Sequence, residues 1–467
     1  MTLNNPNNMN KELVSTNPAK GYEEVGRIAV STREEVENAV NKAREALPAW
    51  RALSAKERGE YFQKFLDIYK NHVGELAELQ TKEMGKPLSE SLSECNGRAM
   101  ALELNIERSV RVLQPQILDE YQTHQTEMHF EPFGVVVAIA PWNYPTSQIF
   151  IAVGQPLLAG NTVVFKHSEE CPLTSKLIAD LMSEAGFPEG VFTCLYGDGE
   201  VGAMMIEQDI DLILFTGSSP VGEALYKKAA EKFIPAVLEM GGSSPAIVFD
   251  DVDLDETCLS VFGERFSNNG QICCALKRLI VHESIHDAVV AKLTKIIEDQ
   301  VVGDPMDKET TIGSLSAKRQ LEALEKQVED ARKKGATIVT GGKRPEGLDG
   351  SYYMPTLITN TTPDMKVIAE EVFGPVLPIV TFKTEEESVA IANDTTFGLS
   401  AFVYSKDMER ANRVASALEA GQVSINGCSY FSTNAPFGGY KKSGIGRTKG
   451  DIGFLNVTQQ KVISCPK

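Results

Sequence analysis

The chain has 467 residues, of which 42% are hydrophobic and 24% charged, a balance typical of a globular protein with two or three domains. Its net charge of −18 argues against nucleic acid or an anionic membrane surface as a partner. The eight cysteines form no CxxC pair and the six histidines have no metal-ligand spacing. We therefore expect no disulfide framework, no metal site and a cytoplasmic location.

Helical patterns dominate the first hundred residues. Thr32 with Glu35, and Ser54 with Glu57, match capping boxes, which predict helices that run towards Leu53 and Met84. The opening segment MTLNNPNNMNKELVSTNP lacks the apolar core of a signal peptide.

Residues 132–165 carry no charge, a length that would be sufficient to span a membrane. Four prolines and several amide side chains interrupt this segment, and both features are unfavourable in a spanning helix. The segment instead predicts a strand, a loop, a helix and a second strand inside a buried core, with no membrane association.

Apolar runs then alternate with amphipathic stretches, which predicts an α/β fold. The first series has runs at 134–140, 161–167, 212–217 and 236–242. Because each run is apolar throughout, we expect parallel strands covered on both faces, as in a doubly wound sheet.

A second series after Gly241 predicts a second α/β domain, with runs at 245–250, 278–282, 336–342, 375–382, 399–405 and 422–426. The stretches 316–334 and 407–420 have helical patterns, and Gly421 is expected to cap the latter. The segment 454–464 has a strand pattern, for which an ordinary edge strand is one interpretation.

A glycine pattern, GxGxxG, occurs within YGDGEVGA (196–203), where a dinucleotide-binding turn is conceivable. No acidic residue follows at the spacing that would complete such a site. We therefore interpret Gly197 and Gly199 as turn glycines.

The segment FSNNGQICCALKRLIV (266–281) places Cys273 beside a turn, as either a small buried hydrophobe or a covalent nucleophile. Three further motifs favour the nucleophile: PWNYP (141–145), LEMGGSSP (238–245) and EEVFGPV (370–376). With GQIC (270–273), in this order and at these separations, they resemble the aldehyde dehydrogenase superfamily. The resemblance extends from AWRALSAKER (49–58) to PFGGYKKSGIGR (436–447).

This resemblance implies a Rossmann-like NAD-binding domain, a second α/β catalytic domain and a small β oligomerisation arm. We expect the NAD-binding domain at 1–114 and 133–240, and the catalytic domain at 241–435. The arm would comprise 115–132 and 436–467 and would join subunits into a homodimer or homotetramer.

The resemblance also implies the cofactor site, which we expect to contain Trp142, Lys166, Glu169, Gly217, Ser218, Glu371 and Phe373. In the family, the residues matching Lys166 and Glu169 contact the adenosine ribose, and a carboxylate there repels a 2′-phosphate. NAD is therefore favoured, while NADP stays possible. From the residues alone, these two charges are ordinary solvated groups, and EEVFGP is the end of a helix before Pro375.

By the same resemblance, the Cys273 thiolate attacks an aldehyde, and Asn143 with the Cys273 backbone N–H stabilises the oxyanion. Hydride transfer then leaves a thioester, which water activated by Glu239 hydrolyses. The alternatives are that Asn143 caps a turn and that Glu239 is a buried acid paired with a lysine. The register of the motif selects Cys273 over Cys274.

The substrate tunnel is expected to be uncharged and formed by Tyr144, Gln148, Ile151 and Tyr430. Relatives that oxidise succinic semialdehyde usually carry arginines where this chain has Ile151 and Ser267. We therefore expect a neutral aliphatic or aromatic aldehyde, with succinic semialdehyde as the alternative.

Another departure from the family is Thr448 in place of a glutamate, with Ala152 in place of its lysine partner. This leaves Glu239 as the base. A catalytically silent NAD-binding scaffold is an alternative of another class, which intact Cys273, Asn143 and Glu239 disfavour.

Overall fold

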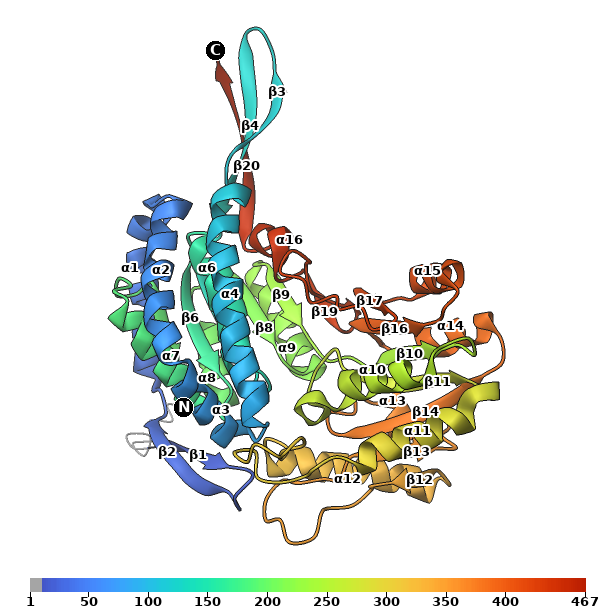
Figure 1. Cartoon of the computed structure of the whole chain (residues 1–467). Coiled ribbons are helices and arrows are strands. Elements are labelled where there is room, and N and C mark those ends of the chain that lie inside the picture. The colour runs from blue at the N-terminus through green and yellow to red at the C-terminus, as the bar shows by residue number, and fades with distance from the viewer. Residues whose placement is uncertain (1–10) are drawn as a thin grey trace.

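The computed structural model describes residues 11–467, which form two sheets flanked by helices and a narrow arm that projects from the body (Figure 1). The first ten residues, which belong to the segment predicted not to be a signal peptide, lie outside the described residues. The predicted α/β fold, with two parallel sheets and an additional β arm, is confirmed.

The first sheet has six strands, and its central strands are the apolar runs of the first series. In spatial order they are β19 (Gly444–Ile445), β9 (Ala236–Glu239), β8 (Leu212–Thr216), β5 (Val135–Ala140), β6 (Thr162–His167) and β7 (Phe192–Leu195). All neighbours are parallel except β19, which pairs antiparallel with β9. The strand order reverses direction at β5, as in a doubly wound sheet, and such a reversal commonly leaves a crevice at the strand ends.

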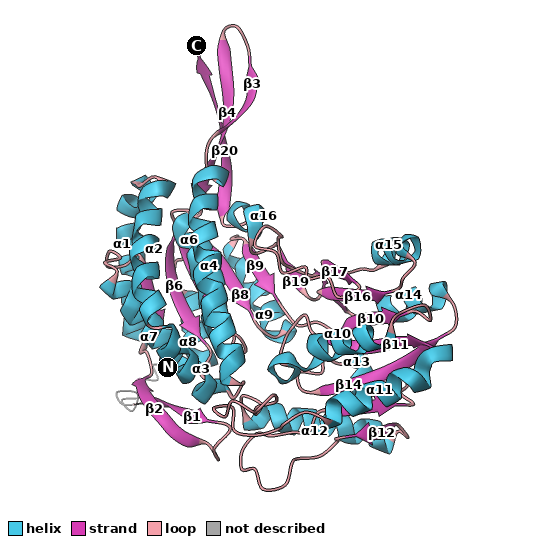
Figure 2. Cartoon of the chain, in the orientation of Figure 1, coloured by secondary structure: helices cyan, strands magenta, loops and turns pink. Residues whose placement is uncertain are grey.

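Helices cover both faces of this sheet (Figure 2). They are α1 (Arg33–Ala52), α2 (Ala55–Asn71), α3 (Val73–Met84), α4 (Leu88–Val112), α5 (Pro145–Ile149), α6 (Gln155–Leu158), α7 (Pro172–Glu184), α8 (Gly199–Glu207), α9 (Ser219–Lys232) and α16 (Gly450–Leu455). Alternate residues of β5 pack into two different hydrophobic cores. Val136 and Ala138 belong to one core, and Val135 and Val137 belong to the other. Burial on both sides explains why each run is apolar throughout.

The predicted helix starts agree with the structure. Thr32 and Ser54 both form complete capping boxes, with Glu35 and Glu57, and these open α1 and α2. The hairpin formed by β1 (Glu12–Asn17) and β2 (Glu23–Ala29) was not predicted, because its residues are mixed polar and apolar and partly exposed.

The second sheet has seven strands. In spatial order they are β12 (Thr337–Thr340), β13 (Thr356–Thr359), β14 (Val376–Phe382), β11 (Leu276–His282), β10 (Ser244–Val248), β16 (Ser400–Tyr404) and β17 (Gln422–Ile425). Only β12 is antiparallel to its neighbour. A short ladder joins β15 (Phe397–Gly398) to β18 (Tyr440–Lys441) beside this sheet.

The helices around the second sheet are α10 (Leu254–Phe266), α11 (His286–Glu298), α12 (Lys318–Lys333), α13 (Lys366–Ala369), α14 (Glu385–Asn393) and α15 (Met408–Ala417), with short 3₁₀ turns η3 (Ser267–Gly270) and η4 (Glu283–Ile285). The prediction that Gly421 caps α15 was wrong. The cap is Leu418 in an extended conformation, and Gly421 lies next to the backbone of Gly438, where a Cβ would be 1.8 Å from the carbonyl oxygen.

The arm is a three-stranded sheet in the order β20 (Thr458–Pro466), β4 (His124–Pro132) and β3 (Gln116–Glu120). Figure 1 shows it extending away from both large sheets. Within 436–467 only β20 belongs to this arm, because β19 and α16 pack with the first sheet. The domain boundaries proposed from the sequence remain a prediction.

Across residues 11–467, the structure contains no helix with both the length and the apolar character needed to cross a membrane.

Candidate active site

Two cavities meet at Cys273. The larger has a volume of about 530 Å³ and the smaller about 200 Å³. Asn143, Gln148, Thr216 and Cys273 line both cavities. A molecule in either cavity can therefore approach the same thiol.

The backbone before Cys273 has an unusual conformation. Asn268, Asn269 and Gly270 have φ angles of +48°, +53° and +68°, in the left-handed region that asparagine and glycine tolerate best. A Cβ on Gly270 would lie 2.5 Å from the Gly374 carbonyl oxygen, so a side chain does not fit there. This explains the NNG sequence that precedes the cysteine motif.

Hydrogen bonds from the two asparagines hold this turn in place. The Asn268 side-chain amide donates to the Asn143 carbonyl oxygen at 2.7 Å, and that of Asn269 donates to the Gly313 carbonyl oxygen at 2.8 Å. The Asn268 backbone N–H donates to the Glu90 carboxylate at 2.9 Å. The turn is thus tied to the β5–α5 loop and to α4.

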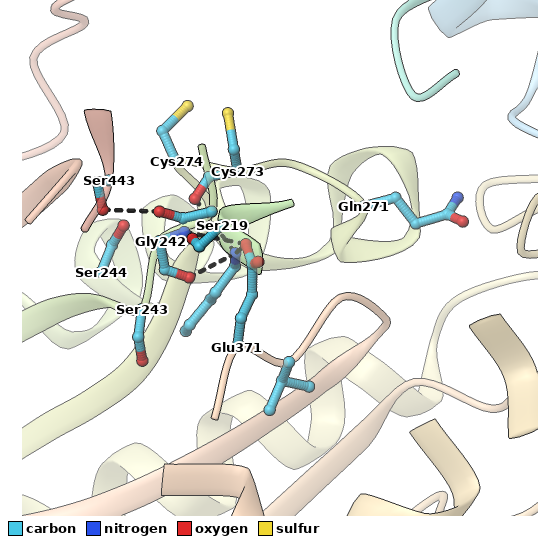
Figure 3. A network of polar contacts seen from close by, with 12 residues as sticks. Ser219, Gly242, Ser243, Ser244, Gln271, Cys273, Cys274, Glu371 and Ser443 are labelled. Atoms are coloured by element: carbon cyan, nitrogen blue, oxygen red, sulfur yellow. Dashed lines mark hydrogen bonds and ion pairs between the residues drawn. The ribbon is translucent and has the colours of Figure 1, made fainter. Parts of the chain in front are cut away.

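The Cys273 and Cys274 side chains project to the same side of their loop, whereas Gln271 points away (Figure 3). Cys273 is half-buried and lines both cavities, while Cys274 is buried and lines only the larger one. The hydrogen bond with Cys274, followed by burial, raises the pKa of the Cys273 thiol. Without a further positive charge, this thiol is protonated at neutral pH.

Asn143 lies in the loop between β5 and α5. Its Nδ2 donates to the Gln271 carbonyl oxygen at 2.8 Å, and its buried Oδ1 has no hydrogen-bond partner in residues 11–467. The side chain therefore bonds across to the cysteine loop and not to its own turn. A second N–H of the same amide is left for a group bound at Cys273.

Glu239 is the buried last residue of β9 and lines the larger cavity. Thr448 Oγ1 donates to Oε1 at 3.4 Å, and Oε2 has no partner within the described chain. Burial, then the charge on Cys273, raises the pKa of this carboxyl, while Lys449 and Arg447 oppose the shift. No ion pair to Glu239 occurs in residues 11–467, so the alternative of a lysine-paired structural acid has no support.

The smaller cavity is lined by Trp142, Gly217, Ser218, Glu371 and Phe373, all predicted from the family resemblance to bind the cofactor. Ser218 is the residue before α9, and its side chain makes no capping hydrogen bond. The N-terminus of this 14-residue helix therefore faces the cavity, a favourable place for a phosphate. A Cβ on Gly217 would lie 2.4 Å from Phe215 Cζ, so only glycine fits.

Glu371 belongs to a network of charged and backbone groups that the sequence did not reveal (Figure 3). Lys277 Nζ donates to the Glu371 carboxylate and, at 2.7 Å, to the Gly242 carbonyl oxygen. The buried Arg265 guanidinium donates to the carbonyl oxygens of Val372 and Gly374. These two cations fix the 371–374 segment against the cysteine loop.

Lys166 and Glu169 lie outside the wall of the smaller cavity. Lys166 is buried at the end of β6, where burial lowers its pKa, and its Nζ lies 4.0 Å from the Glu169 carboxylate. Glu169 also forms an ion pair at 3.0 Å with Arg319 of α12, as does Glu170. Arg319 was not predicted, and it places a second cation beside the proposed ribose-binding acid.

Of the predicted tunnel residues, Tyr144, Gln148 and Ile151 line the larger cavity, as does Ser267. Tyr430 lies directly behind this wall, and its assignment to the tunnel remains a prediction. Its hydroxyl donates to the Cys274 carbonyl oxygen at 3.3 Å and its ring packs against the core of the second sheet, while Phe431 and Phe437 supply the aromatic wall. Ile151 lies in a π-helical turn, Phe150–Gly154, a geometry often found at functional sites.

The expectation of an uncharged tunnel was wrong. Arg98 and Lys449 line the larger cavity, together with the acids Glu90 and Glu94. The charged residues of α4 were not predicted, because the sequence of this helix does not indicate which of its faces lines a cavity. The position of Lys449, directly after the Thr448 departure, was the available clue.

Within residues 11–467, no group of three or more His, Cys, Asp or Glu side chains is arranged to hold a metal ion.

Comparisons with known proteins agree with this geometry. A model of the aldehyde dehydrogenase family matches residues 5–463. An NADP⁺-dependent succinate-semialdehyde dehydrogenase of Escherichia coli is 37% identical over 96% of this chain and 92% of its own length. A peroxisomal aminoaldehyde dehydrogenase of Pisum sativum is 38% identical over 98% of this chain and 93% of its own.

Among solved structures, betaine aldehyde dehydrogenase of Staphylococcus aureus in complex with NAD⁺ superposes with a TM-score of 0.94 at 34% identity. The match covers 97% of this chain and 91% of that one. These relatives act on aldehydes with differing charges, so similarity alone does not decide the substrate.

Proposed function

Because this chain belongs to the aldehyde dehydrogenase family of NAD(P)-dependent oxidoreductases, we propose that it oxidises its aldehyde through a covalent intermediate on Cys273. The observation that carries the proposal is the position of this thiol where two cavities meet, with Asn143 and Glu239 on the walls around it. A scaffold that only bound a dinucleotide would not need these three groups together.

In the first half-reaction the Cys273 thiolate adds to the aldehyde carbonyl carbon and forms a thiohemiacetal. The free N–H of Asn143 and the backbone N–H of Cys273 donate to the new oxyanion, a contribution of roughly 10²–10³ in rate for each donor. A bound nicotinamide, which Glu371 and Phe373 would hold, would supply the acceptor for the hydride of this carbon and a positive charge close to the thiol. The product on Cys273 is a thioester.

Hydrolysis of the thioester requires an activated water. Glu239 lines the same cavity as Cys273 and has one unpartnered carboxylate oxygen, so it can accept a proton from a water in that space. Attack of this water on the thioester carbon releases the carboxylic acid and returns the thiol. Thr448 orients the other oxygen of Glu239 through its hydroxyl.

For the cofactor, the residues of the smaller cavity fit a nicotinamide dinucleotide. The N-terminus of α9 with Ser218 would hold the pyrophosphate, and Glu371 and Phe373 the nicotinamide ribose and ring. Lys166 and Glu169 would contact the adenosine ribose. The Glu169 carboxylate favours NAD, and NADP remains possible because Arg319 lies beside it.

The substrate is a small-molecule aldehyde. The preference for a neutral aldehyde was inferred from Ile151 and Ser267 on an uncharged wall, and Arg98 and Lys449 remove that premise. We further propose a homodimer or homotetramer joined through the arm. A reducing, cytoplasmic setting suits eight cysteines that are all free.

The test is replacement of each neighbouring thiol in turn. Cys273→Ala should abolish NADH formation from aldehydes while NAD binding, followed by quenching of protein fluorescence, is retained. Cys274→Ala should keep activity, because its thiol does not reach the cofactor side. Retained turnover in Cys273→Ala, with loss in Cys274→Ala, would show that the nucleophile is misassigned.

A further inference from the structure

Two cations in the larger cavity have no anionic partner among the residues that the structure describes. Arg98 projects from α4 and Lys449 lies just before α16, and both line the cavity that contains Cys273. Neither forms an ion pair with any carboxylate of residues 11–467, although the chain contains 39 other close cation–anion contacts within that range. An unpaired cation in a cavity wall is a candidate anion-binding group.

The Lys449 ammonium is held in place by aromatic rings, which do not neutralise it. Its Nζ lies 4.7 Å from the centre of the Phe437 ring and 5.1 Å from that of Phe431. Its backbone N–H donates to Gln155 Oε1 at 3.0 Å, which fixes the start of the side chain. The rings therefore orient a positive charge that remains available to a ligand.

Arg98 contributes a second positive charge to the same space. Its half-buried side chain has a buried Nε with no hydrogen-bond partner in the described residues. Burial, followed by the charge of Arg98, lowers the pKa of Lys449 to about 8. The two cations thus lie close enough to repel one another while no anion separates them.

The acids of this cavity are already engaged. Glu94 accepts from the buried Lys86 ammonium and, at 2.7 Å, from the Ser147 backbone N–H. Glu90 accepts from the Asn268 N–H, and burial raises its pKa, which favours its neutral form. The cavity therefore offers two unpaired cations and no equally free carboxylate apart from the catalytic Glu239.

We propose that Arg98 and Lys449 bind the distal carboxylate of an ω-carboxy aldehyde, the semialdehyde of a short dicarboxylic acid, while its aldehyde group reaches Cys273. The assignment rests on the proposed function. An arginine fork and a lysine ammonium can together satisfy both oxygens of a carboxylate. This pair would supply the positive charge for the substrate carboxylate that Ile151 and Ser267 cannot supply.

This assignment separates two classes of substrate, aldehydes that carry a carboxylate and aldehydes that carry a positive charge. A cationic aldehyde would meet two like charges in the wall, whose repulsion opposes binding. Lys449 also lies near Glu239, so a role limited to tuning that base must be separated from substrate recognition. A ratio of efficiencies between two substrates achieves this, because a damaged base slows both.

The experiment measures kcat/KM for succinic semialdehyde, butanal and 4-aminobutanal with the full-length enzyme and NAD. We expect wild type to favour succinic semialdehyde over butanal by at least about tenfold, with 4-aminobutanal the poorest, since a hydrogen bond to a charged group contributes about 10- to 100-fold. A wild-type preference for butanal or 4-aminobutanal would overturn the inference.

Variants then assign the effect to the two cations. Lys449→Met and Arg98→Gln should each lower the succinic semialdehyde-to-butanal ratio about 10- to 100-fold, while Lys449→Arg should retain most of it. The matched control is Lys442→Met, which removes an exposed lysine that does not line the cavity, seven residues before Lys449, and should leave the ratio unchanged. An unchanged ratio in both cavity variants would contradict the proposal.

A binding measurement covers variants that fold poorly or turn over slowly. Succinate should inhibit wild-type butanal oxidation competitively and should inhibit Lys449→Met about tenfold less well. Equal inhibition of both would count against the assignment. If no aldehyde is oxidised by wild type, the proposed function itself fails, whereas oxidation of butanal without a carboxylate preference refutes only this inference.

Discussion

At the scale of single residues, the site contains two acidic groups that burial holds in their neutral, protonated forms. Glu239 has a buried carboxyl with a raised pKa, and Cys273 has a thiol whose pKa is raised by Cys274 and by burial. In the roles proposed here, base for Glu239 and nucleophile for Cys273, each must lose a proton to act. Their protonation therefore controls the two half-reactions separately.

Glu239→Gln should slow thioester hydrolysis more than thioester formation. Rapid mixing with NAD and aldehyde should then show a burst of NADH followed by slow turnover. In wild type, the hydrolysis rate should rise with pH across the neutral range, because only the ionised carboxylate accepts a proton and its pKa lies above the ordinary value. The variant should lack this rise, and an unchanged steady-state rate in Glu239→Gln would exclude the base role.

Glu169→Gln should shift the cofactor preference towards NADP. Removal of the carboxylate leaves Lys166 and Arg319 without their shared anion, so a 2′-phosphate would meet two cations in place of a repelling acid. We expect the ratio of kcat/KM with NADP to kcat/KM with NAD to rise about tenfold, the effect of ~1.4 kcal/mol.

The matched control for this change is Glu170→Gln, because Glu170 also pairs with Arg319 but is not assigned to the ribose. Steady-state assays with both cofactors provide the measurement. An equal shift in the two variants would mean that Arg319, and not the acid at 169, sets the preference.

At the scale of elements, the ends of neighbouring strands position Asn143, the residue proposed to stabilise the oxyanion. His167 is the buried last residue of β6, and its Nε2 donates at 2.8 Å to the carbonyl oxygen of Pro141, which follows β5. Asn143 stands two residues further along that loop. The neutral imidazole thus joins two parallel strands where the chain turns into the site.

Because burial lowers the pKa of His167 to about 3, this residue should make folding sensitive to acid. In the unfolded chain this imidazole binds a proton near pH 6.5, whereas in the folded chain it stays neutral down to about pH 3. Its contribution to the free energy of unfolding is therefore fully present above pH 6.5 and is lost as the pH falls from there towards 3. The full loss is at most about 5 kcal/mol. His167→Gln keeps a donor for the Pro141 carbonyl oxygen. In this variant the free energy of unfolding in urea should depend less on pH between 6.5 and 4.

His286→Gln serves as the control, since His286 lies at the start of the surface helix α11 and contacts the exposed Asp287. It should leave the pH dependence of unfolding as in wild type. A slope that persists in His167→Gln would assign the acid sensitivity to other groups.

The elements also show what the sequence could and could not predict. The strands around β5 were predictable, because burial on both faces demands uninterrupted apolar runs. The strands β7 and β13 were not predicted; three of the four residues of β7 are only half-buried, and the β1–β2 hairpin is partly exposed with many polar residues. Capping boxes placed α1 and α2 because that signal is local.

For the site, Cys273, Asn143 and Glu239 came from a family resemblance and not from periodicity or composition. The sequence did not predict Arg98, Lys277 or Lys449 as site residues, because the role of a charged side chain depends on which groups tertiary packing places opposite it. Phe431 was missed beside Tyr430 for the same reason: which of two adjacent aromatic residues faces the cavity depends on the loop conformation.

At the scale of the whole molecule, the arm carries apolar side chains into solvent. Ile117 and Val462 are each 60% exposed, and Leu118, Tyr121 and Ile463 lie on the same small sheet or its turn. Exposed apolar residues in a projecting sheet are typical of a surface that another subunit covers. The partner that suits the proposed assembly is a second copy of this chain.

Ile117→Asp combined with Val462→Asp should therefore weaken the assembly. Light scattering during size-exclusion chromatography should give a smaller mass for the double variant than for wild type at equal concentration. The control Met408→Asp alters an exposed apolar residue on α15, far from the arm, and should leave the mass unchanged. A wild-type mass of one chain would contradict assembly through the arm.

The late strands β19 and β20 also have a consequence for biosynthesis. Glu239 pairs with Gly444, and His124 with Pro466, so the outer edges of β9 and β4 receive their partners only after about 200 to 340 further residues have been translated. At roughly 5–20 residues per second, β9 waits for about 10–40 s on the ribosome with an unpaired edge. Such edges invite pairing with other nascent chains, so the yield of active enzyme should depend on protection by chaperones during this interval.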